Sequence, residues 1–323
     1  MKQKTLFLLL ILMLLTACSN GQVLTQEVAI QPTVTPLQAQ PSFGSAQDES
    51  DSVEEAVIAP IVTPVISIST PKPPLERDEW MQWPAVPTGV SDAMRDVYQF
   101  GLSQGNDPTH FSVIGDCQNV SSYFLAVFEN PDEFSLGDEY EYLQPTIDYY
   151  QGSFSRVSVA VQGGFNAAAV ISPLRADPEI CNSNESPLDC ELRIWKPSVV
   201  IVSMETWWSQ KPEEEYEKYM RRVLDRIIET GAVPIIATKA DNLEGEHAIN
   251  NTVAKLAYEY HIPLWNYWAA VQPLPDHGLS DDGFHLTFAR NFFDDPVRMR
   301  NAWPWRNLTA LQTLDVVRKE LAK

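Results

Sequence analysis

Five short apolar runs, rich in Val and Ile, recur from residue 111 onward without the polar alternation of a half-exposed strand. Strands that are buried on both faces have this pattern, as the strands of a parallel sheet do. The sequence therefore predicts five parallel strands, at 111–114, 157–161, 199–204, 233–237 and 263–265.

Helical patterns separate the later strands. Apolar residues recur every three or four positions between 213 and 230, and Gly231 follows as a stop. The same spacing occurs at 91–103, 247–260 and 308–321. Strands and helices that alternate in this way predict an α/β fold: a doubly wound, mainly parallel five-stranded sheet between two helix layers, in three-layer α/β/α order. Ligands of such folds bind at the carboxyl ends of the strands.

The first seventeen residues have the pattern of a signal peptide. Lys2 and Lys4 precede an apolar run, 6–15, that is too short to span a bilayer. The run ends in Leu15-Thr16-Ala17-Cys18, which resembles a bacterial lipobox. The resemblance implies cleavage before Cys18, lipidation of its thiol and an extracytoplasmic place in the bacterial cell envelope. The alternative is a signal peptide in which Cys18 is incidental.

A stalk is expected between this signal and the folded domain. Residues 18–79 are rich in Pro, Thr, Gln, Ser and acids, and offer no sustained apolar face. Prolines among β-branched residues favour an extended chain without a ladder. We therefore expect a disordered stalk over 18–79 and one domain over 80–323.

The charge of the chain limits its partners. The 323 residues include 23 Lys+Arg and 43 Asp+Glu, a net charge of −20. Recognition of a phosphate backbone needs a basic surface, so no nucleic-acid partner is expected. Docking on anionic lipid is disfavoured for the same reason, which leaves the lipid on Cys18 as the membrane link. An acidic surface also repels anions, so a neutral substrate is favoured.

Chemically useful residues follow the predicted strands. In chain order they are Gly115-Asp116-Cys117, Gln162-Gly163-Gly164-Phe165-Asn166, Glu205-Thr206-Trp207-Trp208 and Asp282-Gly283-Phe284-His285. These pieces, in this order, resemble the SGNH/GDSL hydrolase superfamily over about residues 110–290. The resemblance implies a flavodoxin-like sheet of the SGNH-hydrolase type and an activity on acyl esters.

The first and last pieces carry the catalytic roles that the resemblance implies. The family has Gly-Asp-Ser with a nucleophilic Ser, and Asp-x-x-His with a basic His. Here Cys117 would be the nucleophile, His285 the base and Asp282 its orienter, while Asp116 would support the turn. A thiol can serve, because a nearby His⁺ or helix N-terminus lowers its pKa from about 8.5. Such a site would hydrolyse or transfer an acyl group through a thioester.

The middle pieces depart from the family. Its third block is Gly-x-Asn-Asp, with an Asn that donates to the oxyanion, whereas this chain has Trp207 at the Asn place. Gly163 or Gly164 could supply a backbone N–H, and Asn166 could replace the lost amide. Thr206 and Trp207 are further candidates for the oxyanion and substrate site.

Other interpretations stay open. Cys117 could be a small buried hydrophobe, and His285 a surface histidine in a loop. The domain could be a retired hydrolase that binds carbohydrate or other envelope material. Tryptophans after the third strand and in the loop before the last helix suit sugar stacking, or they pack against the core; they are Trp207, Trp208, Trp303 and Trp305.

The remaining cysteines suggest one disulfide. Cys181 and Cys190 bracket a polar loop and are the natural pair in an oxidising compartment. The alternative is a bridge from Cys117 to one of them. The five histidines show no metal-ligand spacing and the chain has no Gly-rich phosphate loop, so no metal and no cofactor are expected.

Overall fold

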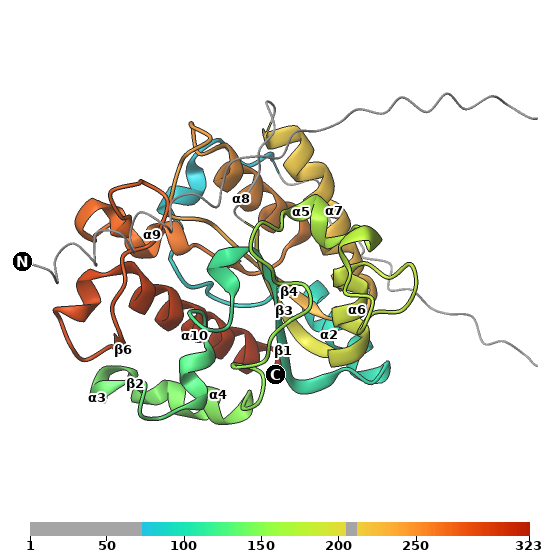
Figure 1. The fold of residues 1–323 in the computed structure, drawn as a ribbon, viewed down its shortest axis with the longest axis horizontal. Coiled ribbons are helices and arrows are strands. Elements are labelled where there is room, and N and C mark those ends of the chain that lie inside the picture. Colours follow the sequence, from blue (N-terminus) through green and yellow to red (C-terminus); the bar gives the residue numbers. More distant parts are fainter. Residues whose placement is uncertain (1–72, 205–211) are drawn as a thin grey trace, which may run out of the picture. The chain divides into compact units, whose positions relative to one another are not determined.

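The structure is a computed structural model that describes residues 73–204 and 212–323 (Figure 1). Its main sheet has four parallel strands in the order β1-β3-β4-β5. Their bounds are β1 Asp107–Gly115, β3 Pro197–Ser203, β4 Val233–Ala237 and β5 Leu264–Trp265. β3 and β4 are buried along their whole length, which explains their uninterrupted apolar sequence. The short strands β2 (Phe134–Ser135) and β6 (Asn291–Phe292) form a second, two-stranded parallel sheet.

The main sheet has four strands and not the predicted five, because residues 157–161 make only one parallel bridge, between Val161 and Gly115. The Ser158 hydroxyl accepts a hydrogen bond from the N–H of Ala160, and the Ser158 carbonyl accepts one from Val161. These local bonds compete with a strand ladder. This bridge places residues 157–161 beside β1, so the order across the sheet is 157–161, β1, β3, β4, β5. When the five predicted segments are numbered in chain order, this is the order 2-1-3-4-5 of a flavodoxin-like doubly wound sheet.

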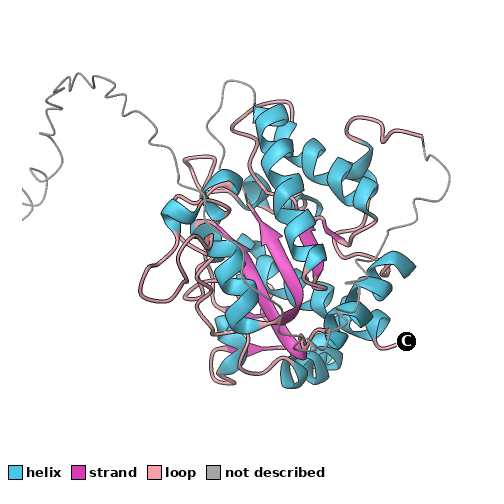
Figure 2. Cartoon of the chain, turned by 90° about the vertical axis from the view of Figure 1, so that its right-hand side faces the viewer, coloured by secondary structure: helices cyan, strands magenta, loops and turns pink. Residues whose placement is uncertain are grey.

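Helices cover both faces of the sheet (Figure 2). In one group, α7 (Pro212–Glu229) packs between α6 (Pro187–Trp195) and α8 (Ala248–Tyr260). In the other, α10 (Ala302–Leu321) packs on α9 and α4, and an Arg95–Glu320 ion pair ties α2 to its C-terminal end. The remaining bounds are α2 Asp92–Ser103, α3 Gly137–Tyr140, α4 Gln144–Tyr149, α5 Ala167–Val170 and α9 Tyr267–Val271.

The helices predicted at 91–103, 213–230 and 247–260 are α2, α7 and α8. Ser91 caps α2, since its hydroxyl accepts a hydrogen bond from the N–H of Met94. Gly231 follows α7 with a φ of 78°, and a Cβ there would lie 2.2 Å from the Cα of Gly101. The turn therefore needs glycine both for its backbone conformation and for this close approach.

The last helix begins six residues earlier than predicted, at Ala302 instead of residue 308. Trp303 and Trp305 therefore lie in its first turns and not in a loop. Pro304 obscures this start, because proline usually interrupts a helix. In the first turn proline is tolerated, since the N–H groups there have no partner within the helix.

Residues 73–79, which the sequence assigns to the end of the stalk, contact α8. The Tyr258 hydroxyl donates to the Pro73 carbonyl at 3.0 Å, and the N–H of Asp78 donates to Asn251. The predicted signal peptide, Cys18 and the stalk up to residue 72 lie outside the described residues. Within the part that is described, no helix combines the length and apolarity needed to cross a membrane.

Candidate functional site

β1 ends in a tight turn that places Cys117 at the surface. A Cβ added to Gly115 would lie 2.2 Å from Nδ2 of Asn119 and 2.6 Å from the carbonyl oxygen of Ser203. Only glycine therefore fits between the turn and the end of β3. Cys117 is exposed and lies outside the disulfide, so the interpretation of a buried small hydrophobe is wrong.

Asp116 stabilises this turn from the protein interior. Its side chain is only 1% exposed and accepts a hydrogen bond from the N–H of Gln118 at 3.1 Å. It thereby caps the short 3-10 helix η2 (Cys117–Asn119). Asn119 Nδ2 lies 3.4 Å from the same carboxylate oxygen. The position of the thiol therefore depends on a buried acid one residue before it.

A buried arginine from α10 joins the turn to the end of β3. Nη2 of Arg306 donates to Asn119 Oδ1 at 3.1 Å and to Ser203 Oγ at 3.0 Å, and the residue is fully buried. Aromatic rings surround its guanidinium at 4.9 to 6.0 Å: Phe124, Tyr267, Trp265 and Trp303. Ring faces partly compensate the lost hydration of a cation. Arg306 and Asn119 were missed from the sequence, where nothing distinguishes this arginine from a solvated one.

Asp282 and His285 form the second half of the candidate site. Nδ1 of His285 lies 2.5 Å from Oδ2 of Asp282. The other carboxylate oxygen accepts hydrogen bonds from the backbone N–H groups of His285, at 2.9 Å, and Phe284, at 3.0 Å. The bond from the His285 ring, followed by these two, lowers the pKa of Asp282 to about 2 from its ordinary 3.8. Asp282 is thus a carboxylate that orients the imidazole.

A short hairpin holds this pair. The N–H of Ser280 donates to the carbonyl of His285 at 2.7 Å, and Leu279 and Leu286 form an antiparallel bridge. Gly283 makes the turn between the pair with a φ of 68°. The pair faces solvent, with 65% of the His285 side chain and 51% of the Asp282 side chain exposed. Most of the His285 side chain is therefore accessible to solvent.

The segments that follow Cys117 and His285 meet at the start of α10. The ring of Tyr123, six residues after Cys117, lies 6.5 Å from that of Phe288, three residues after His285. The side chain of Asn307 accepts a hydrogen bond from the N–H of Leu125 at 2.7 Å and donates to the carbonyl of Tyr123. The fold thus brings together the surroundings of the two predicted catalytic elements, which lie about 170 residues apart in the chain.

Gly163, in the segment 162–166 that the sequence analysis singled out, lies beside Cys117. A Cβ built on Gly163 would be 3.9 Å from the Cβ of Cys117, and the N–H of Gln162 donates to the carbonyl of Gly115. Gly164 has a φ of 83°, which favours glycine. Of the residues that the sequence proposed for the oxyanion, Gly163 therefore lies next to Cys117.

Asn166 has a structural role as a helix cap. Its Oδ1 accepts hydrogen bonds from the N–H groups of Ala168 and Ala169, and it caps the single turn α5. Only its amide nitrogen remains for donation to a ligand. The other proposed residues of the oxyanion and substrate site, Thr206 and Trp207, lie outside the described residues.

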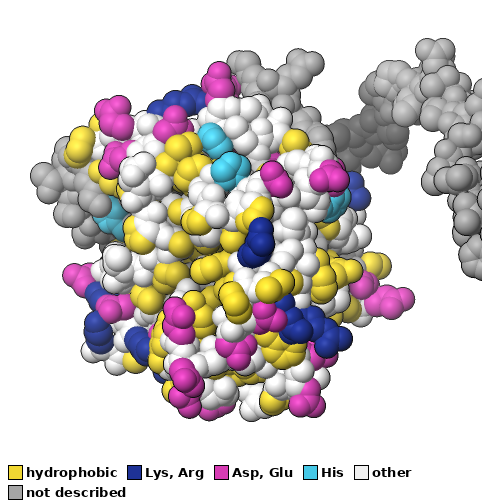
Figure 3. Space-filling model, turned by 90° about the vertical axis from the view of Figure 1, so that its left-hand side faces the viewer, with side chains coloured by type: hydrophobic (Ala, Val, Ile, Leu, Met, Phe, Trp, Pro, Cys, Tyr) yellow, Lys and Arg dark blue, Asp and Glu magenta, His cyan; other side chains and the backbone are white. Residues whose placement is uncertain are grey.

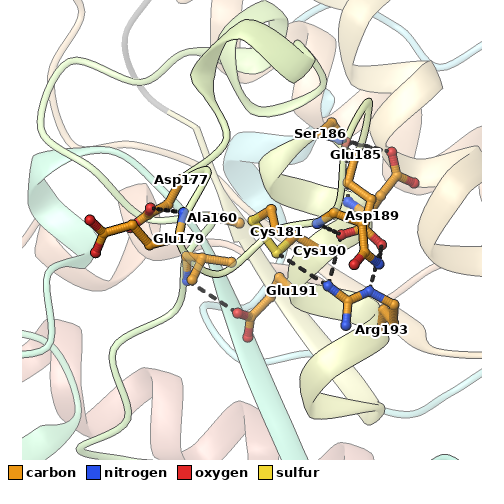
Figure 4. Close-up of a disulfide and its surroundings, with 12 residues drawn as sticks. Ala160, Asp177, Glu179, Cys181, Glu185, Ser186, Asp189, Cys190, Glu191 and Arg193 are labelled. Atoms are coloured by element: carbon orange, nitrogen blue, oxygen red, sulfur yellow. Dashed lines mark hydrogen bonds and ion pairs between the residues drawn. A yellow bond between two sulfur atoms is a disulfide. The ribbon is translucent and has the colours of Figure 1, made fainter.

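The predicted disulfide between Cys181 and Cys190 is confirmed (Figure 4). It excludes a bridge from Cys117 to either partner. With Glu185, the two cysteines form the only group within the described ranges that has the spacing of a metal site. Their sulfur atoms are bonded to each other, so this group offers no thiolate ligands.

Glu191, the residue after Cys190, supports residues 157–161, which lie beside β1 through the Val161–Gly115 bridge. Glu191 is fully buried and forms an ion pair with Arg156. It also accepts hydrogen bonds from the Ser112 hydroxyl and from the N–H of Val159. The disulfide thus joins Cys181 to the helix that carries Glu191, and Glu191 in turn holds residues 156–159, which precede Gly163 in the chain.

No family model matches the sequence, and no curated protein matches it. Among solved structures, a chain from Desulfitobacterium hafniense DCB-2, assigned to the G-D-S-L family of lipolytic proteins, aligns with 64% of this chain and 99% of its own length. The identity is 12% and the TM-score 0.39. The α/β fold is shown by the sheet order described above.

Proposed function

We propose that this domain is an ester hydrolase or acyltransferase in which Cys117 is the nucleophile, His285 the base and Asp282 its orienter. The observation that supports this most is the hydrogen bond between Nδ1 of His285 and the Asp282 carboxylate. The carboxylate can only accept, so the ring proton belongs on Nδ1 and the lone pair on Nε2. An imidazole held in this tautomer is ready to accept a proton from a thiol.

The reaction proceeds in two steps. The Cys117 thiol gives its proton to Nε2 of His285, and the sulfur attacks the acyl carbonyl. The tetrahedral intermediate collapses to a thioester, while His285 protonates the departing alcohol. Water, or the hydroxyl of an acceptor, then attacks the thioester with His285 as base, which releases the acyl group and restores the thiol. We assign the N–H groups of Cys117 and of Gly163 or Gly164 to the oxyanion.

Turnover of p-nitrophenyl acetate tests this proposal. The variants Cys117→Ala and His285→Ala are expected to lose it, while both keep the circular dichroism spectrum of the wild type. Iodoacetamide should label Cys117 rapidly near neutral pH, and His285→Ala should slow the labelling. Unchanged turnover in both variants would refute the proposal.

A second candidate is a non-catalytic domain that binds carbohydrate or other envelope material. The exposure of the Asp282–His285 pair favours it, since water weakens the electrostatic effect of the carboxylate on the ring. It predicts slow labelling of Cys117 near neutral pH that His285→Ala leaves unchanged, and quenching of tryptophan fluorescence by sugars. The two candidates therefore differ in the reactivity of one thiol.

The place of the protein in the cell is part of the proposal. We infer a lipid anchor on Cys18, an extracytoplasmic domain and an acyl ester of a small molecule or glycan as substrate. The net charge of −20 supports a neutral substrate and argues against nucleic acid. The Cys18→Ala variant, expressed from the full-length gene, should appear in the soluble fraction instead of the membrane fraction and should lack the mass of an acyl group.

A further inference from the structure

The first turn of α10 is bonded to the hairpin that carries His285. The N–H groups of Ala302 and Trp303 both donate to the carbonyl of Thr287 at 3.1 Å, and the Thr287 hydroxyl accepts from the N–H of Ala302 at 3.0 Å. The first N–H groups of a helix have no acceptor within it, and the preceding Asn301 gives no side-chain cap. Thr287 therefore caps α10 from a position only two residues after His285.

The other end of the hairpin packs on the same helical turn. The carbonyl of Gly278 accepts hydrogen bonds from the N–H of Thr287, at 2.8 Å, and from its hydroxyl, at 3.0 Å. A Cβ added to Gly278 would lie only 2.7 Å from the Cβ of Ala302, and Ala302 is fully buried. Only glycine therefore lets the hairpin lie this close to α10.

The second turn of α10 is bonded to the segment that carries Cys117. Arg306 donates to Asn119, two residues after Cys117, at 3.1 Å. The next residue, Asn307, accepts a hydrogen bond from the N–H of Leu125 at 2.7 Å. Arg306 and Asn307 are both fully buried, and Arg306 lies one helical turn, about 6 Å, beyond the contact with the hairpin. Neighbouring turns of one helix thus contact both halves of the candidate site.

The helix that makes these contacts belongs to the core. Its buried residues run from Ala302 to Leu321, and it packs on α9 and β6. Figure 3 shows the face that carries α9 and β6, with hydrophobic side chains across its middle and most charged side chains toward its rim. Both candidate catalytic segments lie outside the regular strands and helices, and segments of that kind are mobile unless a packed element holds them.

We propose that the start of α10 sets the distance between Cys117 and His285. The positioning residues are Gly278, Thr287 and Arg306. The inference rests on the proposed function, in which the thiol gives its proton to the imidazole across hydrogen-bond reach. A shift of the hairpin by about 1 Å would slow that transfer by up to about 10²-fold. The bond between the imidazole and its carboxylate lies within the hairpin, so the base would keep its orientation and lose its partner.

Labelling of Cys117 by iodoacetamide near neutral pH measures the pairing without a substrate. In the wild type, His285→Ala should slow the labelling by about tenfold, because less of the thiol is ionised. Gly278→Ala forces the hairpin away from α10, since carbon atoms in contact rest about 3.5–4.0 Å apart. In that background His285→Ala should slow the labelling by less than about twofold, because the ring no longer reaches the sulfur.

A second substitution separates this displacement from backbone strain. Gly278→Ala/Ala302→Gly moves the methyl group from one partner to the other, which removes the 2.7 Å approach and should restore the full effect of His285→Ala. Gly152→Ala is the matched control. Gly152 also has a positive φ, of 91°, but a Cβ there meets nothing within 4 Å. The control should keep the wild-type effect of His285→Ala.

The hydroxyl of Thr287 is tested by kinetics. Thr287→Val keeps the size of the side chain but removes its hydrogen bonds to Ala302 and Gly278. We expect kcat for p-nitrophenyl acetate to fall by about tenfold with KM changed by less than about twofold, and Thr287→Ser to restore kcat. Thr313→Val is the control, since the Thr313 hydroxyl donates within α10, to the carbonyl of Thr309.

The turn on the other side is tested in the same way. Arg306→Lys keeps the charge but not the planar group that donates to both Asn119 and Ser203, so kcat should again fall with little change in KM. Arg318→Lys is the control, because Arg318 lies at the far end of α10 and donates to Thr146. Circular dichroism shows whether each variant is folded.

The possible outcomes are distinct. An equal effect of His285→Ala on labelling in the wild type and in Gly278→Ala would overturn the inference, as would an unchanged kcat in Thr287→Val if Gly278→Ala does not fold. No effect of His285→Ala in the wild type would refute the pairing of thiol and imidazole, and the inference with it. Rescue by Ala302→Gly together with full ester turnover in Cys117→Ala would uphold the positioning role and refute the thiol as nucleophile.

Discussion

Nδ1 of His285 lies 2.5 Å from Oδ2 of Asp282, three residues earlier in the same hairpin. The pair is local, so its geometry does not depend on distant packing. The hydrogen-bond direction of its second ring nitrogen, Nε2, diverges from that of Nδ1, so Nε2 is not directed at the carboxylate. The role of Asp282 can therefore be tested without disturbing the fold.

The Asp282→Asn variant is expected to lose most of its esterase activity. An amide can donate to Nδ1 and so favour the tautomer with its proton on Nε2, which cannot accept a proton from the thiol. We expect kcat for p-nitrophenyl acetate to fall by about 10²-fold or more. Asp281→Asn is the matched control, as it removes a neighbouring exposed acid. Equal activity of the two variants would contradict the role given to Asp282.

The pKa of Asp282 gives a second test that needs no substrate. Because this pKa is lowered from 3.8 to about 2, the His285 bond is fully present above pH 3.8 and is lost as the pH falls through about 2. Carbon-detected NMR of the side-chain carboxyl should show a midpoint near 2. In His285→Ala the largest cause is removed, so the midpoint should move back toward 3.8. A midpoint that does not move would show that the imidazole is not the main cause.

The alternation of strands and helices could be predicted because long buried elements leave a strong periodic signal. β1, β3, β4 and β5, and helices α2, α7 and α8, are all where the sequence indicates. Residues 157–161 have the composition of a strand, but the Ser158 hydroxyl bonds its own backbone and Glu191 holds Val159 from another element. Such a competition between local and tertiary bonds is invisible in a run of five residues.

Arg306→Met is expected to destabilise the domain. Methionine fills much of the same space but removes the hydrogen bonds that Nη2 of Arg306 donates to Asn119 Oδ1 and Ser203 Oγ in the core. We expect the free energy of unfolding to fall by about 3 kcal/mol, because two buried hydrogen bonds to a charged group are lost. Urea denaturation followed by fluorescence measures this change. Arg175→Met, at an exposed position, is the control and should change the value by less than about 0.5 kcal/mol; an equal effect of both would refute the structural role of Arg306.

Of the candidate site, the sequence could indicate the residues that belong to short local motifs. Cys117, Asp282 and His285 are of this kind. Arg306, Tyr123 and Phe288 are not, because their significance arises only when α10 brings the β1 turn and the hairpin together. Tertiary proximity between residues about 170 positions apart leaves no trace in one sequence without relatives to compare.

Gly115→Ala should damage both stability and the candidate site. The added Cβ would lie 2.2 Å from Asn119 Nδ2 and 2.6 Å from a backbone oxygen of β3, which cannot move aside as a flexible side chain could. We expect a loss of about 3 kcal/mol in unfolding free energy, and slower alkylation of Cys117. Gly89→Ala is the control, because its Cβ would come no closer than 3.9 Å to Glu320. A Gly115→Ala protein as stable as the control would show that the turn is less tightly packed than described.

Removal of the disulfide should weaken the domain without affecting the thiol chemistry directly. Cys181 and Cys190 are nine positions apart, and closing a loop of that length is worth about 2–3 kcal/mol through the entropy of the unfolded chain. The double variant Cys181→Ser/Cys190→Ser should therefore unfold at lower urea, and dithiothreitol should shift the wild type to the same midpoint. Cys117→Ser is the control, since it should leave both the midpoint and its response to dithiothreitol unchanged. If the double variant also lost alkylation of Cys117 under conditions where it remains folded, the effect would act through Glu191, which follows Cys190. Glu191 accepts a hydrogen bond from the N–H of Val159 and so holds the segment before Gly163.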